Sequence, residues 1–135
     1  MRIATLPLLM FMLLVVARES AYTKEVDLGE GFKIKNGREA VVREKKLWIL
    51  FKSVSNDSRC ATGATCVWEG NAAIEIEVSK KNAPTVATLS IWLGQKESGY
   101  EGFKIKVIAL SPYPKLDVPI DPKDYEVTVV VTKDE

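Results

Sequence analysis

The sequence predicts an all-β protein: an immunoglobulin-like β-sandwich of about seven or eight antiparallel strands, with a small β-barrel as the alternative. Three observations lead to this prediction. Apolar and polar residues alternate along most of the chain after residue 21, which is the period of a strand with one buried face. Clusters of Gly, Pro, Asn and Ser separate the alternating runs. No window of helical length keeps an apolar stripe at positions i, i+3 and i+4.

Seven alternating runs supply the predicted strands. In chain order they cover residues 32–35, 38–44 (a shorter candidate), 47–54, 72–78, 87–93, 103–107 and 125–131. Turn signals lie between them at 36–37, 80–84, 94–102 and 111–114. In each run the apolar face is expected to point inward. The predicted core residues are Leu47, Ile49, Phe51, Ile74, Ile76, Leu89, Ile91, Ile105, Val107, Val127 and Val129.

The first 21 residues have the layout of a secretory signal peptide. A positive start at Met1-Arg2 precedes an apolar run over residues 3–16. At about 1.5 Å per residue this run spans only ~21 Å, which is short of a ~30 Å hydrocarbon core. A cleaved signal is therefore favoured over an uncleaved anchor, with cleavage after Ala17 or Ala21. Residues 22–135 then form a single β-sandwich domain that is secreted or extracytoplasmic, or membrane-anchored if the signal is uncleaved.

The charge pattern argues against nucleic acid as a partner. The chain has 19 Lys and Arg against 18 Asp and Glu, and cleavage after Ala17 removes Arg2, which leaves 18 of each. The two signs are interspersed, whereas nucleic-acid binding needs a basic excess on one side. No second apolar run reaches membrane-spanning length, so no membrane span is expected in the mature chain. The expected partner is an extracytoplasmic protein or a glycan.

One segment interrupts the alternating pattern: residues 56–70, with the sequence NDSRCATGATCVWEG. It contains both cysteines of the chain, and two cysteines in an exported protein predict one disulfide, Cys60–Cys66. The segment connects two central strands and is rich in Asn, Asp, Ser, Thr and Gly, as long ordered loops are. Trp68 is expected to pack back onto the sandwich beneath this loop. Asn56-Asp57-Ser58 also matches the N-glycosylation sequon.

The same segment resembles a family of uncharacterised exported prokaryotic proteins that carry an Asp-Ser-Arg-Cys…Cys-x-Trp-x-Gly motif. The resemblance spans most of the mature chain, although Ala61 stands where the family often has Pro after the first Cys. It implies the compartment and the fold, and it implies no activity. The matching residues are Asp57, Ser58, Arg59, Cys60, Cys66, Trp68 and Gly70.

The residue types argue against an enzyme. The chain has no His, which excludes His-based triads and imidazole metal sites. Two thiols are too few for a structural zinc site, and a bridged Cys60 is no nucleophile. Ser58 has only Asp57 as a neighbouring base, and on an extended chain Asp57 points the other way. We therefore predict a protein without catalysis, without a metal and without a cofactor.

Three functions remain open from the sequence. The first is a non-catalytic binding or structural role, in which Asp57, Ser58, Trp68 and Gly70 order the loop or contact a partner. In this interpretation Arg59 lies against Asp57 or the loop carbonyls. The second is a protease inhibitor that presents Arg59 to a trypsin-like pocket on a disulfide-stiffened loop. The third is a carbohydrate-binding module that uses Trp92, which falls on the outward register of its strand.

Overall fold

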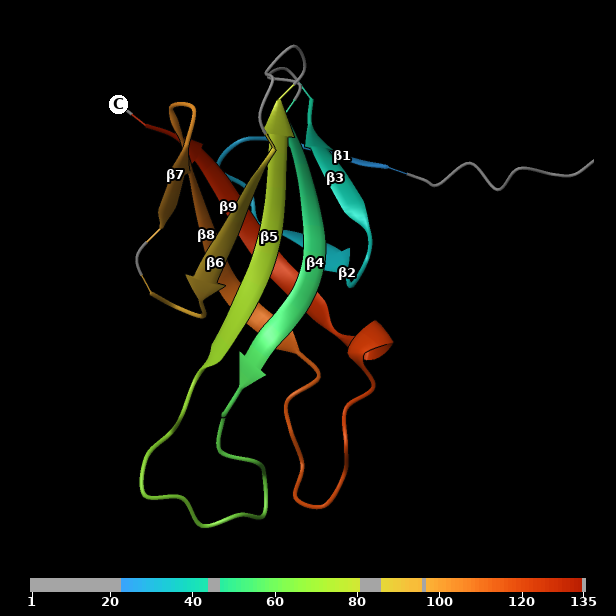
Figure 1. Cartoon of the computed structure of the whole chain (residues 1–135), viewed down its shortest axis with the longest axis vertical. Helices are drawn as coiled ribbons and strands as arrows, with labels where there is room; N and C mark the ends of the chain where they lie inside the picture. The colour runs from blue at the N-terminus through green and yellow to red at the C-terminus, as the bar shows by residue number, and fades with distance from the viewer. Residues whose placement is uncertain (1–22, 44–46, 81–85, 96, 135) are drawn as a thin grey trace, which may run out of the picture.

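The computed structural model describes residues 23–43, 47–80, 86–95 and 97–134, and the predicted signal peptide lies outside these ranges. Within them, nine strands form two sheets that pack face to face and do not close into a barrel (Figure 1). The predicted β-sandwich is therefore confirmed, and the barrel alternative is wrong. No helix in the described ranges is long and apolar enough to cross a bilayer.

One sheet has five strands and the other has four. The five-stranded sheet has the order β1 (Lys24–Val26), β3 (Glu39–Val42), β4 (Leu47–Asp57), β5 (Ala72–Lys80) and β6 (Ala87–Trp92). The four-stranded sheet has the order β2 (Phe32–Lys35), β9 (Glu126–Lys133), β8 (Phe103–Ser111) and β7 (Ser98–Tyr100). A short 3-10 helix, η1 (Pro122–Asp124), comes before β9.

Two of these strands have no counterpart in the sequence prediction. β1 and β7 have three residues each, which is too short for an alternating pattern to show. β1 also pairs with β3 in the parallel direction, whereas the other described pairings between strands are antiparallel. The prediction of seven or eight antiparallel strands is thus corrected to nine, with one parallel pair.

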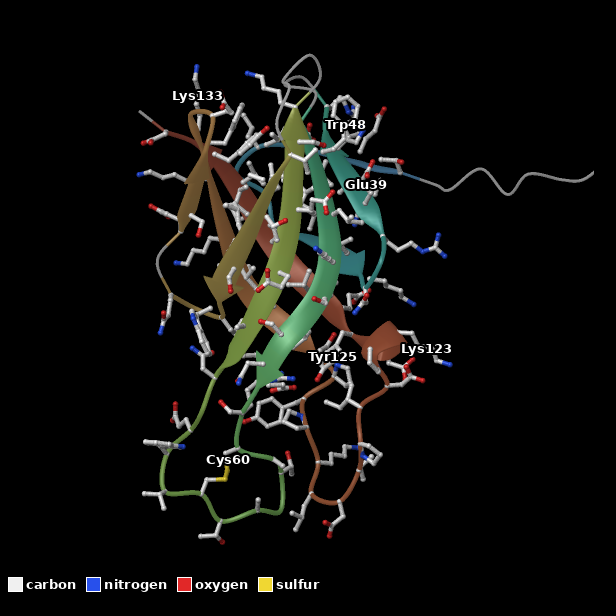
Figure 2. The ribbon with its side chains drawn as sticks, viewed as in Figure 1. Glu39, Trp48, Cys60, Lys123, Tyr125 and Lys133 are labelled. Atoms are coloured by element: carbon white, nitrogen blue, oxygen red, sulfur yellow. A yellow bond between two sulfur atoms is a disulfide. The ribbon has the colours of Figure 1, made fainter. Side chains whose placement is uncertain are left out.

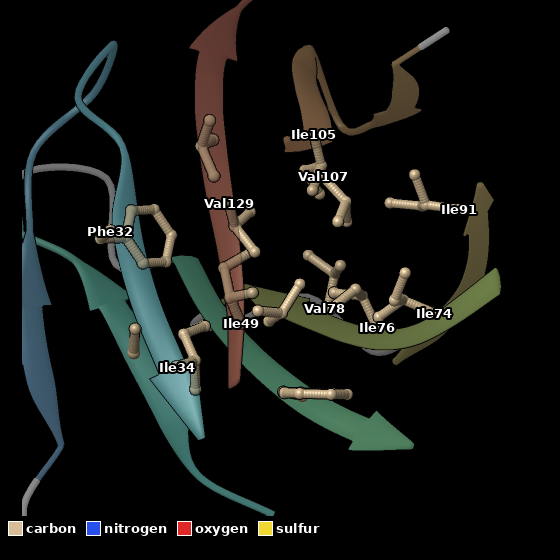
Figure 3. Close-up of a cluster of buried hydrophobic side chains, with 14 of the residues drawn as sticks. Phe32, Ile34, Ile49, Ile74, Ile76, Val78, Ile91, Ile105, Val107 and Val129 are labelled. Atoms are coloured by element: carbon tan, nitrogen blue, oxygen red, sulfur yellow. The ribbon is translucent and has the colours of Figure 1, made fainter. Parts of the chain in front are cut away.

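The core lies between the two sheets, where the alternating apolar residues meet (Figure 3). Every predicted core residue is buried except Leu89, which is partly buried. Leu89 lies on β6, an edge strand of the five-stranded sheet, so fewer neighbours cover it. Other buried core residues include Phe32, Ile34, Ala40, Val42, Phe103 and Val131.

Three β-bulges control which side chains face the space between the sheets. β4 carries two of them within residues 51–56, and each adds one residue to its strand. Because the two one-residue shifts cancel, Asp57 lies on the same inward side of β4 as Ile49 and Phe51. β8 carries one between Val107 and Ala109, which turns Leu110 inward, where it is buried. Without the β8 bulge Leu110 would point outward.

Two long connections leave the sandwich at the same end, below both sheets in Figure 1. The first, L1, covers residues 58–71 between β4 and β5, and the second, L2, covers residues 112–121 between β8 and η1. The Ser111–Pro112 peptide bond at the start of L2 is cis. L1 contains the motif and the cysteines noted in the sequence, and L2 is its neighbour from the other sheet.

Candidate functional site

Arg59 lies where L1 meets the start of L2, and it contacts both. Its guanidinium forms a two-point ion pair with Asp57, in which Nε–Oδ1 and Nη2–Oδ2 are both 2.8 Å. It also donates to the backbone carbonyls of Leu110 (Nη1, 2.8 Å) and Pro112 (Nη2, 3.0 Å). The Tyr113 ring centroid is 5.3 Å from Cζ, within cation–π range. Because Arg59 is only 9% exposed, one buried side chain joins the two loops.

The Tyr125 hydroxyl completes this network, which we call the Arg59 clamp. It donates a 2.8 Å hydrogen bond to Asp57 Oδ2. Tyr125 lies between η1 and β9 (labelled in Figure 2). Burial acts to raise the pKa of the Asp57 carboxyl, but hydrogen bonds from Arg59 and Tyr125 outweigh burial and hold that pKa below its usual value. Burial, with the hydrogen bond to Asp57, raises the pKa of Tyr125 to about 12. At neutral pH the carboxylate is therefore ionised and the phenol is neutral.

The base of L1 continues the pairing of β4 with β5 beyond the ends of both strands. Ser58 N–H donates to the Asn71 carbonyl (2.7 Å), and Cys60 N–H donates to the Glu69 carbonyl (2.8 Å). The Ser58 hydroxyl also donates to the Asn71 carbonyl, at 2.9 Å. Gly70 lies between these pairs with φ +69°, and a Cβ at this position would overlap the Ser58 carbonyl. Only glycine fits at Gly70.

The tip of L1 is held by the predicted disulfide, Cys60–Cys66, which is present with a Cα–Cα distance of 6.0 Å. The disulfide attaches Cys66 to Cys60, and the hydrogen bond described above attaches Glu69 to the same residue. Val67 and Trp68 lie between these two attachments. They form a two-residue projection that is held at both ends.

L1 and L2 are also hydrogen-bonded to each other near their tips. Thr62 N–H donates to the Pro114 carbonyl (2.9 Å), and Leu116 N–H donates to the Thr62 carbonyl (3.0 Å). Gly63 lies beside Leu116, since a Cβ on Gly63 would be 3.6 Å from the Leu116 Cβ. The two loops therefore form one connected unit, fixed at the base by the Arg59 clamp and at the tip by these bonds.

This unit carries most of the exposed large apolar side chains of the described residues. Eight such side chains are exposed, and five of them lie on L1 and L2. Trp68 is 80% exposed and Val67 is fully exposed. An open hollow of about 510 Å³ lies beside Trp68, lined by Ser58, Cys66, Val67 and Trp68. We call the five side chains the loop end: Val67, Trp68, Tyr113, Leu116 and Val118.

The structure confirms one expectation about the motif and overturns another. Arg59 lies against Asp57 and backbone carbonyls, as expected from the sequence. Trp68 was expected to pack back onto the sandwich, and this is wrong because Trp68 projects into solvent. Trp92 does face outward and is 41% exposed, but it lies at the end of β6, where it pairs with Ala73 of β5, and not on L1 or L2.

Sequence reasoning missed the partners of Arg59 outside the motif. The acceptors on Leu110 and Pro112 are backbone carbonyls, which have no signature in a sequence. Tyr125 was placed in a strand, but its hydroxyl was not given a role. A signal was available, because a Tyr at the start of a buried run needs a partner for its hydroxyl. A second signal was that one carboxylate cannot accept from all five N–H groups of a buried Arg, so Arg59 needed further acceptors besides Asp57.

The described residues hold no group of three or more His, Cys, Asp or Glu side chains that could bind a metal ion. Every buried side-chain nitrogen or oxygen in the described ranges has a hydrogen-bond partner. Compared with protein-family models, curated proteins and solved structures, the chain gives no match. The site is therefore interpreted from its own residues.

Replacement of Arg59 by Ala should lower the free energy of unfolding by roughly 3–5 kcal/mol, because it leaves Asp57 as a buried charge without its partner. Arg59→Lys should recover only part of this loss, since an ammonium cannot make the two-point contact. Urea denaturation measures the free energy of unfolding of both variants. The matched control is Arg43→Ala, which removes an exposed pair with Glu25 and should cost less than about 1 kcal/mol. Equal losses for Arg59→Ala and Arg43→Ala would contradict the clamp.

The raised pKa of Tyr125 predicts a loss of stability at high pH. Because the folded pKa of about 12 lies above the unfolded one of about 10, the phenol's contribution is complete below pH 10. It is lost as the pH rises to about 12. Unfolding free energies measured from pH 9 to 12 should fall more steeply for the wild type than for Tyr125→Phe.

Reduction of the disulfide should release the tip of L1 and leave the sandwich folded. The ring is short, so the chain-entropy model gives it only about 2 kcal/mol of stability. Hydrogen exchange should therefore speed up in residues 63–68 on reduction and stay slow in β4 and β5. A Cys60→Ser/Cys66→Ser variant should show the fast pattern with or without reductant. Global unfolding on reduction at room temperature would contradict this expectation.

Proposed function

We propose that this protein is a non-catalytic binding module whose recognition surface is the loop end. The observation that carries the proposal is the concentration of exposed apolar side chains on L1 and L2. Exposed hydrophobic groups scattered singly over a surface need no explanation, but a cluster at one end of a molecule is typical of an interaction site. The loops also lie at the end of a rigid sandwich, which is where binding residues are commonly placed.

The exposure of Trp68 is energetically costly and supports a binding role. A Trp side chain contributes 150–250 Å² of surface, worth about 25 cal/mol per Å² when buried. At 80% exposure, roughly 3–5 kcal/mol of hydrophobic stabilisation is unrealised in the free protein. A partner that covers Trp68 would gain much of this free energy. The projection is also held in place beforehand, so little conformational freedom is lost on binding.

The chemistry of the motif supports binding rather than catalysis. The chain has no His, both thiols are in the disulfide, and the Asp57 carboxylate is engaged by Arg59 and Tyr125. The buried position of Arg59 also removes the support for the inhibitor hypothesis. Its guanidinium would have to leave the ion pair with Asp57 and both carbonyls before it could enter a protease pocket.

Three expectations from the sequence form part of this proposal. Export through a cleaved signal peptide is supported by the disulfide, since such bonds persist in oxidising compartments. An immunoglobulin-like relationship is supported by the two-sheet architecture alone. Membership of the family of exported prokaryotic proteins is supported by the motif, in which Arg59, Cys60, Cys66 and Gly70 all have structural roles here.

Carbohydrate binding at Trp92 is a second candidate function. The exposed Trp92 ring lies beside an open hollow of about 510 Å³, which Ser90, Gln95 and Ser98 also line. An aromatic face beside neutral hydrogen-bonding groups suits a sugar ring. In a titration with oligosaccharides, Trp92→Ala should abolish binding and Trp68→Ser should leave it unchanged. Binding that survives Trp92→Ala would remove this candidate.

The recognition role of the loop end is tested by capture from the native extracytoplasmic fraction. The mature chain is immobilised through its C-terminus, because β9 ends on the opposite side of the sandwich from the loops (Figure 1). Val67→Ser/Trp68→Ser should lose the material that the wild type retains, because the change removes the projecting apolar side chains. Val86→Ser is the matched control, an exposed Val at the far end of the sandwich next to β6. Equal capture by the loop variant and the wild type would overturn the proposal.

A further inference from the structure

We infer that the partner of the loop end is the neutral interface of a lipid bilayer, into which the tips of L1 and L2 insert. The inference rests on the proposed function, since it names the partner of the same surface. The first observation in its favour is the shape of the loop end. Val67 and Trp68 project from a loop held at both ends, and Leu116 and Val118 project from the neighbouring loop. Separate projecting side chains suit a soft surface that closes around each of them.

The side-chain types at the loop end are those that favour the bilayer interface. Trp and Tyr are enriched at the level of the lipid headgroups, where an amphipathic ring has one wet end and one apolar end. Trp68 and Tyr113 supply such rings, and both are more than half exposed. The aliphatic side chains of Val67, Leu116 and Val118 would enter the region just beneath, as apolar faces of interfacial proteins do.

The charge of the tips matches a neutral surface. Charged residues make up 27% of the chain, yet residues 60–68 contain none, and the exposed Glu69 comes directly after them. L2 carries Lys115, Asp117 and Asp121, so neither loop holds a basic cluster. Proteins that bind anionic membranes use clusters of Lys and Arg instead. Zwitterionic headgroups with no net charge therefore complement these loops, and the attraction should depend little on salt because Debye screening acts on net charges.

Part of the backbone of the tips is already hydrogen-bonded within the protein. The hydrogen bonds of Thr62 with Pro114 and Leu116 satisfy groups that would otherwise need water. The bond between Cys60 N–H and the Glu69 carbonyl does the same beside Trp68. Insertion of these loops to interfacial depth therefore leaves these paired groups undisturbed.

The experiment is co-sedimentation of the mature chain with large unilamellar vesicles of pure phosphatidylcholine. The wild type should bind, and Val67→Ser/Trp68→Ser should reduce partitioning by at least about tenfold, because affinity scales with the apolar area inserted. Val86→Ser, a change at an exposed position at the far end of the sandwich, should bind as the wild type does. A variant with Trp48→Phe and Trp92→Phe keeps only Trp68. Its fluorescence emission should shift to shorter wavelength when vesicles are added.

Two further measurements decide between this partner and others. Binding should change by less than about twofold when the NaCl concentration rises from 0.1 M to 1 M, and it should not grow when anionic lipid is added. Absence of vesicle binding by the wild type, or equal binding by Val67→Ser/Trp68→Ser, overturns the inference. If a protein is then captured through the loop end in the extracytoplasmic fraction, the proposed function stands with a protein partner. If neither vesicles nor such a protein bind there, both proposals fail.

Discussion

The arrangement of the two loops depends on one buried guanidinium. Arg59 bonds to a carboxylate at the end of β4 and to two carbonyls at the end of β8, so it joins the two sheets where the core ends. A charge removed from water is tolerated only when its hydrogen-bonding groups find partners. The Asp57 carboxylate has the same requirement, which Tyr125 helps to meet. The β8 bulge contributes to this arrangement, because it turns Leu110 inward where β8 ends beside Arg59.

The loop end reverses the usual distribution of residue types. Arg is seldom buried and Trp is seldom left in water, yet Arg59 is buried and Trp68 is exposed within ten residues of each other. The buried charge is explained by folding, since its hydrogen bonds hold L1 and L2. The exposed ring has no such explanation, because little of its surface is buried in the free protein. Its exposure is therefore the feature that points to function.

Rigidity connects the buried clamp with the exposed tip. The chain is fixed in steps: by Arg59 at the base, by the pairing of Cys60 with Glu69, and by the disulfide at Cys66. Each step limits the positions open to Val67 and Trp68. A surface prepared in this way loses little conformational entropy when a partner covers it, which offsets part of the cost of exposing apolar groups.

The sequence by itself determined the class of fold, the positions of the longer strands and the disulfide. Alternation is a property of neighbouring residues, so the runs around Ile49, Ile76 and Val129 could be recognised without knowledge of their partners. The pairing of Asp57 with Arg59 was accessible for the same reason, since they are two residues apart on one side of the chain. Only the tertiary structure decided that the guanidinium reaches carbonyls more than fifty residues away and that Trp68 faces solvent. Those outcomes depend on bulges and on contacts between loops from opposite sheets, which leave no periodic trace in a sequence.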